Sequence, residues 1–193
     1  MTCPRFTRRR ARPALDAGED SLMLATVEPD EHSLTPEDEP ADATPVHFKD
    51  FDLESAVREE LGKTEGAITR KDLASLRVFM AEKHEICDLS GLEYATNLDW
   101  LFLGRNQIND LTPLGKLTNL SRLFLFNNQI SDVTPLVGLT KLERLYLPFN
   151  RISDITPLAK LTFLSKLFLF ENPIPDDQKA MLEKILPSCE IRF

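Results

Sequence analysis

The stretch that decides the fold begins at Leu98, runs to residue 171 and repeats with a period of 22 residues. Written in phase, it consists of LDWLFLGRNQINDLTPLGKLTN (98–119), LSRLFLFNNQISDVTPLVGLTK (120–141), LERLYLPFNRISDITPLAKLTF (142–163) and the partial copy LSKLFLFE (164–171). A degenerate copy, LRVFMAEKHEICDLSGLEYATN (76–97), precedes them in the same phase. Copies that keep one phase over this length do not arise by chance.

The shared pattern LxxLxLxxNxIxxLxxLxxLxx is that of a leucine-rich repeat. Side chains alternate along a strand, so the residues at positions 4 and 6 of each repeat point inward. Together with the leucines and isoleucines at positions 1, 11, 14, 17 and 20, they form the predicted core. The inward pairs are Leu101 and Leu103, Leu123 and Leu125, Leu145 and Leu147, and Leu167 and Leu169.

Two polar columns have structural roles in this pattern. The asparagines at position 9 can satisfy backbone groups where each strand turns away, and His84 takes their place in the first repeat as a substitute turn residue. The aspartates at position 13 precede short turns and can cap free amides. A calcium ladder would need more oxygens than one aspartate per repeat supplies, so no metal is expected. The columns are Asn106, Asn128, Asn150 and Asn172, and Asp88, Asp110, Asp132 and Asp154.

The apolar ends of a repeat stack must be covered. Residues 47–75 are predicted to form a helical N-terminal cap. Its first helix is expected to be capped by Asp52 and ended by Gly62, and its second to begin with Thr69 and Asp72 as a capping box.

A second cap follows the repeats of residues 76–171. Residues 172–193 are predicted to form a helix over 176–186, which Pro187 ends, and a last short strand over 190–193. The side chains expected to point inward from this helix are Met181, Leu182, Ile185 and Leu186.

The first 46 residues differ in composition from the rest. Five arginines lie within residues 1–12, whereas residues 13–45 carry ten acidic side chains and no lysine or arginine. Such a proline-rich segment cannot bury enough apolar surface to offset its ordering entropy, so we expect a disordered tail over residues 1–46. Most of the net charge of −8 lies there. The near balance of charge elsewhere argues against a nucleic-acid partner, which needs a broad basic face.

Cysteine spacing and the apolar runs bear on location. Cys87 and Cys189 fall at opposite ends of the stack, about 20 Å apart at the strand spacing of about 5 Å, and a disulfide needs Cα atoms within about 7 Å. No bridge between them is expected, which suits a reducing compartment. No apolar run of signal-peptide or membrane-span length is present, so no membrane span is expected. We expect a cytoplasmic protein, with the cell surface or secretion as the alternative if the start site is misassigned.

The motif Asp-[Leu/Val/Ile]-Thr-Pro-Leu recurs over residues 110–114, 132–136 and 154–158. In 22-residue repeats after a helical cap, it resembles bacterial internalin-type leucine-rich-repeat proteins, over roughly residues 50–193. The resemblance implies a right-handed α/β solenoid, with short parallel strands on the concave face and 3₁₀ or irregular turns on the convex face. It also implies that the concave face binds another protein. Compared with the family, the sequence shows neither the usual export signal nor a wall-anchoring motif. Its repeats end in a short helical cap where the family has an immunoglobulin-like module. The family's location is therefore not carried over.

Positions 3, 5 and 7 have the parity opposite to the inward leucines, so their side chains are predicted to lie on the concave face. Position 5 is aromatic in four successive repeats, and position 3 is Trp100 followed by three basic residues. We expect Arg122 to contact Trp100 through a cation–π interaction. The predicted partner-binding residues are Trp100, Phe102, Arg105, Arg122, Phe124, Phe126, Arg144, Tyr146, Phe149, Lys166, Phe168 and Phe170.

This aromatic and basic surface favours a binding role, because the leucines already fill the interior. Large exposed apolar patches usually mark interfaces, and aromatic residues and arginine are enriched at binding hot spots. Only Glu82 and Glu171 oppose the basic side chains, so we expect a monomer whose protein partner has an apolar centre and an acidic edge. As alternatives, the aromatic column only stabilises the strands, as cross-strand pairs do, or it mediates self-association.

Three functions fit these features. The first is a non-catalytic protein-interaction module. The second is a regulatory subunit or scaffold of an intracellular enzyme, similar in logic to the leucine-rich-repeat regulators of protein phosphatase, and the third is an exported surface adhesin. No enzyme activity or cofactor is expected, because the chain has no glycine-rich phosphate loop and no CxxC or HExxH motif. The histidines His32, His47 and His84 have no serine or cysteine partner at a recognisable spacing.

Overall fold

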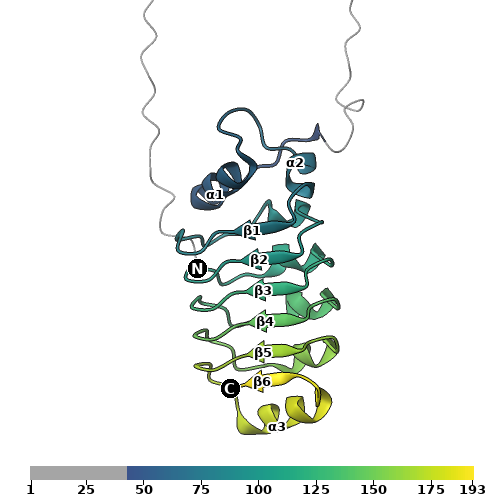
Figure 1. The fold of residues 1–193 in the computed structure, drawn as a ribbon. Coiled ribbons are helices and arrows are strands. Elements are labelled where there is room, and N and C mark those ends of the chain that lie inside the picture. Colours follow the sequence, from purple (N-terminus) through teal and green to yellow (C-terminus); the bar gives the residue numbers. More distant parts are fainter. Residues whose placement is uncertain (1–42) are drawn as a thin grey trace, which may run out of the picture. The chain divides into compact units, whose positions relative to one another are not determined.

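The computed structural model describes residues 43–193, so most of the predicted tail lies outside the described residues. Figure 1 presents this part of the chain as a stack of strands with helices at both ends. Residues 43–46 are attached to the N-terminal cap. Pro45 forms an isolated bridge with Thr69, and the Val46 amide donates to the Ile68 carbonyl at 2.7 Å.

Within residues 43–193, six three-residue strands form one parallel sheet in the order of the sequence. Neighbouring repeat strands pair at the same repeat position, so that Leu101 lies beside Leu123 and Phe102 beside Phe124. Each column of the repeat pattern is therefore a row of adjacent side chains across the sheet. The strands are β1 (Val78–Met80), β2 (Trp100–Phe102), β3 (Arg122–Phe124), β4 (Arg144–Tyr146), β5 (Lys166–Phe168) and β6 (Glu190–Arg192).

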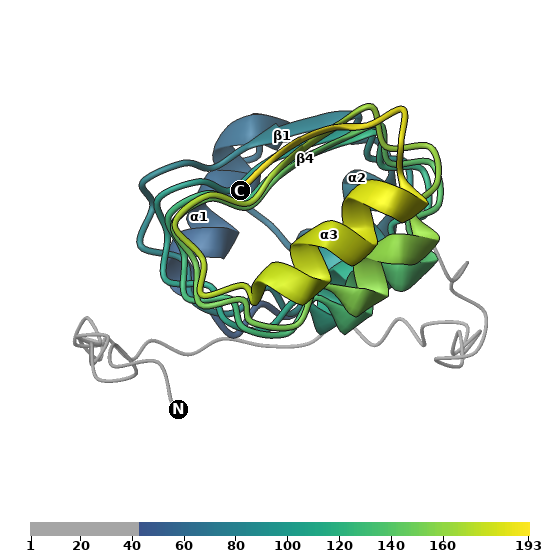
Figure 2. The same ribbon diagram turned by 90° about the horizontal axis from the view of Figure 1, so that it is seen from below.

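The 3₁₀ turns lie on the side of the solenoid opposite the strands (Figure 2). The Asp110 carboxylate accepts a hydrogen bond from the Thr112 amide at 2.8 Å. In the same way, Asp132 accepts from the Thr134 amide at 2.8 Å and Asp154 from the Thr156 amide at 2.9 Å. The predicted capping role of these aspartates is confirmed. The turns span Leu92–Tyr94, Thr112–Lys116, Thr134–Gly138 and Thr156–Lys160.

The predicted leucine core is confirmed. The inward positions of the repeat strands are fully buried, and so are the apolar positions on the turns. Burying a leucine is worth about 1.5–3 kcal/mol relative to leaving it exposed. Because the same positions are buried in every repeat, the repeats share one continuous core, and the outward side chains are not needed to build it.

An asparagine ladder joins successive repeats. The Oδ1 atom of Asn128 accepts the Ile108 amide of the preceding repeat at 3.1 Å. Its Nδ2 donates to the Leu103 carbonyl of that repeat at 3.0 Å and to the Leu125 carbonyl of its own repeat at 3.1 Å. Buried backbone groups at this bend are thereby satisfied, as predicted. The same bonds recur at Asn106, Asn150 and Asn172.

The N-terminal cap consists of α1 (Phe51–Leu61) and α2 (Arg70–Ala74). Gly62 ends α1 in the left-handed conformation, with φ of 61°, as its position predicted. Thr69 and Asp72 form the predicted capping box at the start of α2.

The residue that caps α1 differs from the prediction. Asp50, not Asp52, is the N-cap, and its Oδ1 atom accepts the amides of Asp52 and Leu53 at 2.9 and 3.1 Å. Its other oxygen, Oδ2, accepts the amides of Cys87 and Asp88 in the first repeat at 2.7 and 3.2 Å. Asp50 therefore ties the cap helix to the repeats. These two tertiary contacts distinguish the two aspartates, and the local sequence does not contain them.

The C-terminal cap contains α3 (Asp176–Ile185) and β6, close to the predicted bounds. Leu182 and Leu186 are buried as expected. The prediction was wrong for Ile185, whose side chain is 45% exposed because it lies on the outer side of the helix end.

Candidate protein-binding face

The outward side chains of β1–β5 form one surface, which we call the strand face. In each of β2–β5 the middle residue is buried and the two flanking residues are half-buried, as side-chain alternation requires. Position 3 and position 5 of each repeat therefore lie side by side on this face. The predicted binding residues at these positions are brought together into two adjacent rows.

The rings at position 5 form a continuous column. Phe102 stacks on Phe124 with a centroid separation of 4.4 Å and an interplanar angle of 7°. Phe124 stacks on Tyr146 at 4.5 Å and 12°. Tyr146 then meets Phe168 at 4.8 Å and 70°, so the last ring is turned edge-on to the rest. The column is half-buried, and much of each ring face is covered by its neighbour.

This packing determines which part of each ring faces solvent. The face of an aromatic ring carries partial negative charge and its edge partial positive charge. In the stacked part of the column the faces contact each other, which leaves the edges outward. The surface therefore favours the faces of aromatic rings from another molecule.

The face of Phe168 is covered by a side chain that the repeat pattern did not point to. The guanidinium of Arg192, in β6, lies 5.1 Å from the centre of the Phe168 ring. Arg192 is outside the repeats, so only the pairing of β5 with β6 places it here.

The predicted contact between Arg122 and Trp100 is present. The Arg122 guanidinium carbon lies 4.1 Å from the centre of the Trp100 ring. The Nε atom of Arg122 is buried and has no hydrogen-bond partner within the described part of the chain. The stacked geometry holds this charge at the strand face.

The basic row is shorter than the repeats indicated. The Nζ atom of Lys166 lies 3.3 Å from a carboxylate oxygen of Glu190, which also pairs with Arg192 at 2.6 Å. Glu190 was missed because it belongs to the cap strand. By contrast, the guanidinium of Arg144 has no ion pair or hydrogen bond among residues 43–193. The unopposed positive charge is therefore centred on Arg144 and Arg122.

Positions 7 and 8 place more rings and one more cation beside the column. Gly104 leaves room for the ring of Phe126, since a Cβ atom at Gly104 would lie 2.3 Å from that ring. The guanidinium of Arg105 lies 5.8 Å from the centre of the same ring.

Phe149 is the most exposed of the predicted rings, at 51%. Its φ is 56°, in the left-handed region where bulky residues are rare. It meets Phe170 edge-on at 5.5 Å. The repeat bend imposes a positive φ at this position, because Arg105, Asn127 and Glu171 share it. A phenylalanine there is strained and exposed, which the fold does not require.

One residue of the same face was missed. Met80 holds position 5 of the degenerate first repeat, beside Phe102 in the pairing of β1 with β2, and is 59% exposed. It continues the apolar column by one strand. The 22-residue phase contained this information, but the weak match of the first repeat concealed it.

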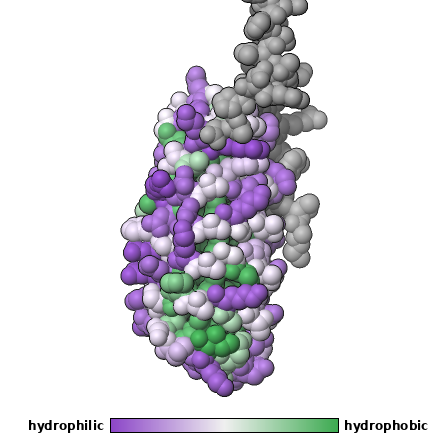
Figure 3. Space-filling view, turned by 90° about the vertical axis from the view of Figure 1, so that its right-hand side faces the viewer, coloured by the Kyte–Doolittle hydropathy of each residue, from purple (hydrophilic) through white to green (hydrophobic). Residues whose placement is uncertain are grey.

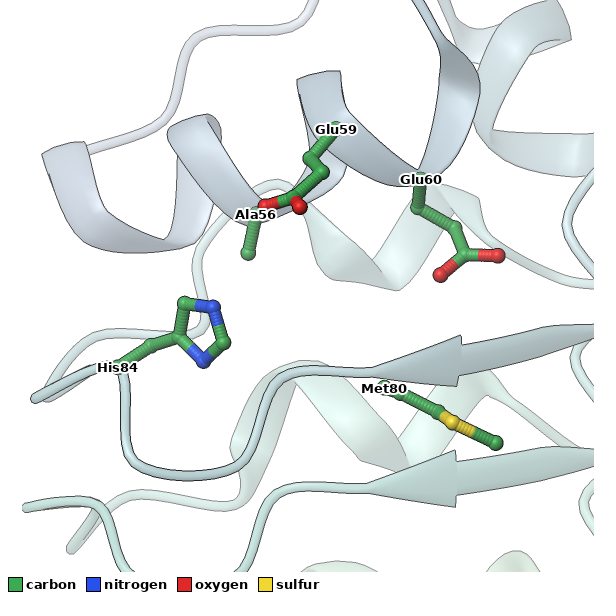
Figure 4. A pocket seen from close by; sticks show the side chains of 5 residues that line it. All are labelled: Ala56, Glu59, Glu60, Met80 and His84. Atoms are coloured by element: carbon green, nitrogen blue, oxygen red, sulfur yellow. The ribbon is translucent and has the colours of Figure 1, made fainter.

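Beyond Met80 the strand face meets the N-terminal cap at a pocket of about 290 Å³. Figure 4 shows the side chains of α1 on one side and those of β1 and its following loop on the other. Ligand-binding pockets in proteins usually have volumes of about 300–1,000 Å³. The size of this pocket therefore suits a single side chain better than a metabolite. It is lined by Ala56, Glu59, Glu60, Met80 and His84.

Groups capable of chemistry are sparse in the described residues. No set of three or more histidine, cysteine or acidic side chains in residues 43–193 is arranged to hold a metal ion. Burial, followed by the charge of Glu190, raises the pKa of the Cys189 thiol to about 11, so it is protonated at neutral pH. The Nδ1 atom of His84 lies within hydrogen-bond distance, 2.8 Å, of the Glu82 backbone carbonyl in the same loop.

Figure 3 shows the right-hand side of the molecule as drawn in Figure 1, which is next to the strand face. It is mostly hydrophilic, with an apolar area towards the C-terminal end. Phe163, which ends the last full repeat, is 72% exposed. None of the helices between residues 43 and 193 has the length and apolar character needed to cross a membrane.

Comparisons with known proteins agree on the repeats. A family model described as leucine-rich repeats, in two copies, matches residues 96–138. An internalin of Listeria monocytogenes is 31% identical, with a TM-score of 0.69 over 77% of this chain and 45% of that one. A leucine-rich-repeat protein of Leptospira interrogans is 32% identical, with a TM-score of 0.59 over 63% of this chain and 32% of that one. The chain thus spans less than half the length of each. No curated protein sequence matches it.

Proposed function

Because the chain is an internalin-like leucine-rich-repeat protein, we propose that it is a non-catalytic module that binds a protein partner on its strand face. The observation that carries the proposal is the row of stacked rings beside the unopposed guanidinium of Arg144. The core is complete without these side chains. Aromatic residues and arginine are also the types most enriched at binding hot spots.

The site is held in shape before a partner arrives. The rings of the column brace one another, and the guanidinium of Arg122 is stacked on Trp100. Side chains that are already ordered lose little conformational entropy on binding, so more of the contact energy contributes to affinity. This supports a binding role in addition to a stabilising one.

The partner surface is apolar where it meets the ring edges and acidic where it meets Arg122 and Arg144. The acidic requirement is centred on the middle of the stack, because Glu190 pairs with Lys166 and Arg192 at the C-terminal end. Phe149 and Phe170 extend the apolar contact at the edge of the face. The acidic region that this partner needs is therefore smaller than the one that the sequence alone predicts.

A matched pair of variants tests the proposal. The strand-face variant is Arg144→Glu with Phe149→Asn, and the control is Lys160→Glu with Phe163→Asn, which makes similar changes at exposed positions away from that face. We expect the strand-face variant to lose the proteins that the wild type captures from a lysate of the source cells, and the control to retain them. Equal capture by both variants, at equal melting temperature, contradicts the proposal.

Location separates the forms that this module can take. A regulatory subunit of an intracellular enzyme remains in the cytoplasm and co-purifies with that enzyme, whereas a surface adhesin is exported. We propose the cytoplasmic form. Fractionation of cells that express the native gene tests it, and recovery of the protein at the cell surface or in the medium would favour the adhesin.

A further inference from the structure

We infer that the pocket between α1 and β1 receives a lysine or arginine side chain of the partner, and so determines the direction in which the partner lies on the strand face. The inference rests on the proposed function and deepens it. The bound segment then has a cationic residue in the pocket beside α1 and an acidic residue in contact with Arg122 and Arg144.

The pocket has the two parts that a long cationic side chain requires. Met80 and Ala56 supply apolar surface, and Glu59 and Glu60 supply carboxylates (Figure 4). Lysine and arginine have apolar stems and charged ends, and they pack best where apolar surface leads to opposite charge. An aliphatic or aromatic side chain would satisfy only the apolar part.

The carboxylates of Glu59 and Glu60 are available for this contact. Neither has an ion pair or a side-chain hydrogen bond within residues 43–193. The two basic residues nearest to them in the sequence, Arg58 and Lys63, are engaged elsewhere. Arg58 pairs with Glu54 at 2.9 Å and donates to the Gly66 carbonyl at 3.0 Å, and Lys63 pairs with Asp72 at 2.7 Å.

The unpaired guanidinium groups of the strand face lie farther along the stack and have the opposite charge. From α1 the face runs from the two carboxylates over Met80 and Phe102 to the guanidinium groups of Arg122 and Arg144. A partner with the same charge at both ends would be repelled at one of them. Charge order of this kind gives orientation and selectivity more than affinity.

The spacing of the two charged regions sets a length for the bound segment. Neighbouring strands lie about 4.8 Å apart, so β1 and β4 are separated by about 14 Å, and the pocket lies slightly beyond β1. An extended chain advances about 3.3 Å per residue. A segment that lies along the solenoid therefore needs its cationic and acidic residues about five positions apart.

Selection of a phage-displayed library of random twelve-residue peptides on the full-length protein tests the inference. We expect the enriched peptides to carry Lys or Arg about five positions from Asp or Glu, with apolar residues between them. Their affinity should fall about tenfold or more on the Glu59→Lys/Glu60→Lys variant, because attraction between the pocket and the cationic side chain becomes repulsion. The change leaves α1 intact, since lysine is favourable near the C-terminal end of a helix.

The control is Glu65→Lys/Glu183→Lys, which alters net charge equally at exposed positions outside the pocket and should bind the peptides as the wild type does. Enriched peptides that need Arg144 and Phe149 but lack a cation, or that bind the pocket variant unchanged, overturn the inference and leave the proposed function standing. If no peptide prefers the wild type to the Arg144→Glu/Phe149→Asn variant, both are contradicted.

Discussion

Phe102 and Phe124, which hold the same position in neighbouring repeats, stack with ring centroids 4.4 Å apart and planes 7° from parallel. Phe124 is also stacked on Tyr146, so both of its faces are in contact. Aromatic pairs of this kind are worth about 0.5–1.5 kcal/mol each beyond their buried area. The column therefore stabilises the sheet in addition to any contact with a partner.

Replacing Phe124 by leucine should lower the free energy of unfolding by about 1–3 kcal/mol, because two stacked pairs are lost. A double-mutant cycle of Phe102→Leu and Phe124→Leu, measured by chemical denaturation, should give a coupling energy of about 0.5–1.5 kcal/mol. A coupling energy near zero would mean that the rings touch without stabilising each other.

Replacing Phe149 tests the strain at the repeat bend. A left-handed conformation costs residues other than glycine and asparagine about 1–2 kcal/mol. Both Phe149→Asn and Phe149→Ala lose the contact with Phe170, but only asparagine relieves the backbone. We expect the asparagine variant to be about 1 kcal/mol more stable than the alanine variant in thermal unfolding. Equal stability of the two would show that the positive φ carries no strain.

Replacing Asp50 should separate its two roles. Asp50→Ala leaves the helix amides and the amides of Cys87 and Asp88 without acceptors, and we expect a loss of about 2–4 kcal/mol. Asp50→Ser retains an acceptor for the helix but is too short to bridge to the repeat, so it should recover only part of that loss. Hydrogen exchange should then be faster in the first repeat while α1 remains protected. Full recovery by serine would rule out the bridging role.

The cap strand should be sensitive to acid. Hydrogen bonds from Arg192 and then Lys166 hold the pKa of Glu190 below its ordinary value of 4.5. A carboxylate with a lowered pKa in the folded state stabilises the protein above pH 4.5, and this contribution disappears as the pH falls through the lowered pKa. Glu190→Gln should therefore lower the melting temperature at pH 7 and have a smaller effect near pH 2, whereas Glu183→Gln serves as an exposed control. A Glu190→Gln effect that is the same at both pH values would contradict the assignment.

The repeats could be predicted because their information is local. A 22-residue phase and side-chain alternation are sufficient to separate the buried leucines from the outward rings, and the parallel register then makes each column a row. The same argument located Arg122 beside Trp100. It required no knowledge of how distant segments meet.

What could not be predicted depends on segments outside the repeat. Asp50 was missed because amides 37 and 38 residues away select it over Asp52. Glu190 and Arg192 were missed because only the pairing of the cap strand brings them to Lys166 and Phe168. The pocket was missed because it exists only once α1 lies over β1.

The asparagine ladder has a direction, and that direction matters while the chain is being made. The amide of Ile108 donates to Asn128, which belongs to the following repeat, whereas the carbonyl of Leu103 already accepts from Asn106 of its own repeat. The bend of a newly made repeat therefore has one backbone amide without its partner until the asparagine of the next repeat has been synthesised. Each repeat completes the one synthesised before it, so ordering lags synthesis by one repeat, and only the last needs a different kind of closure.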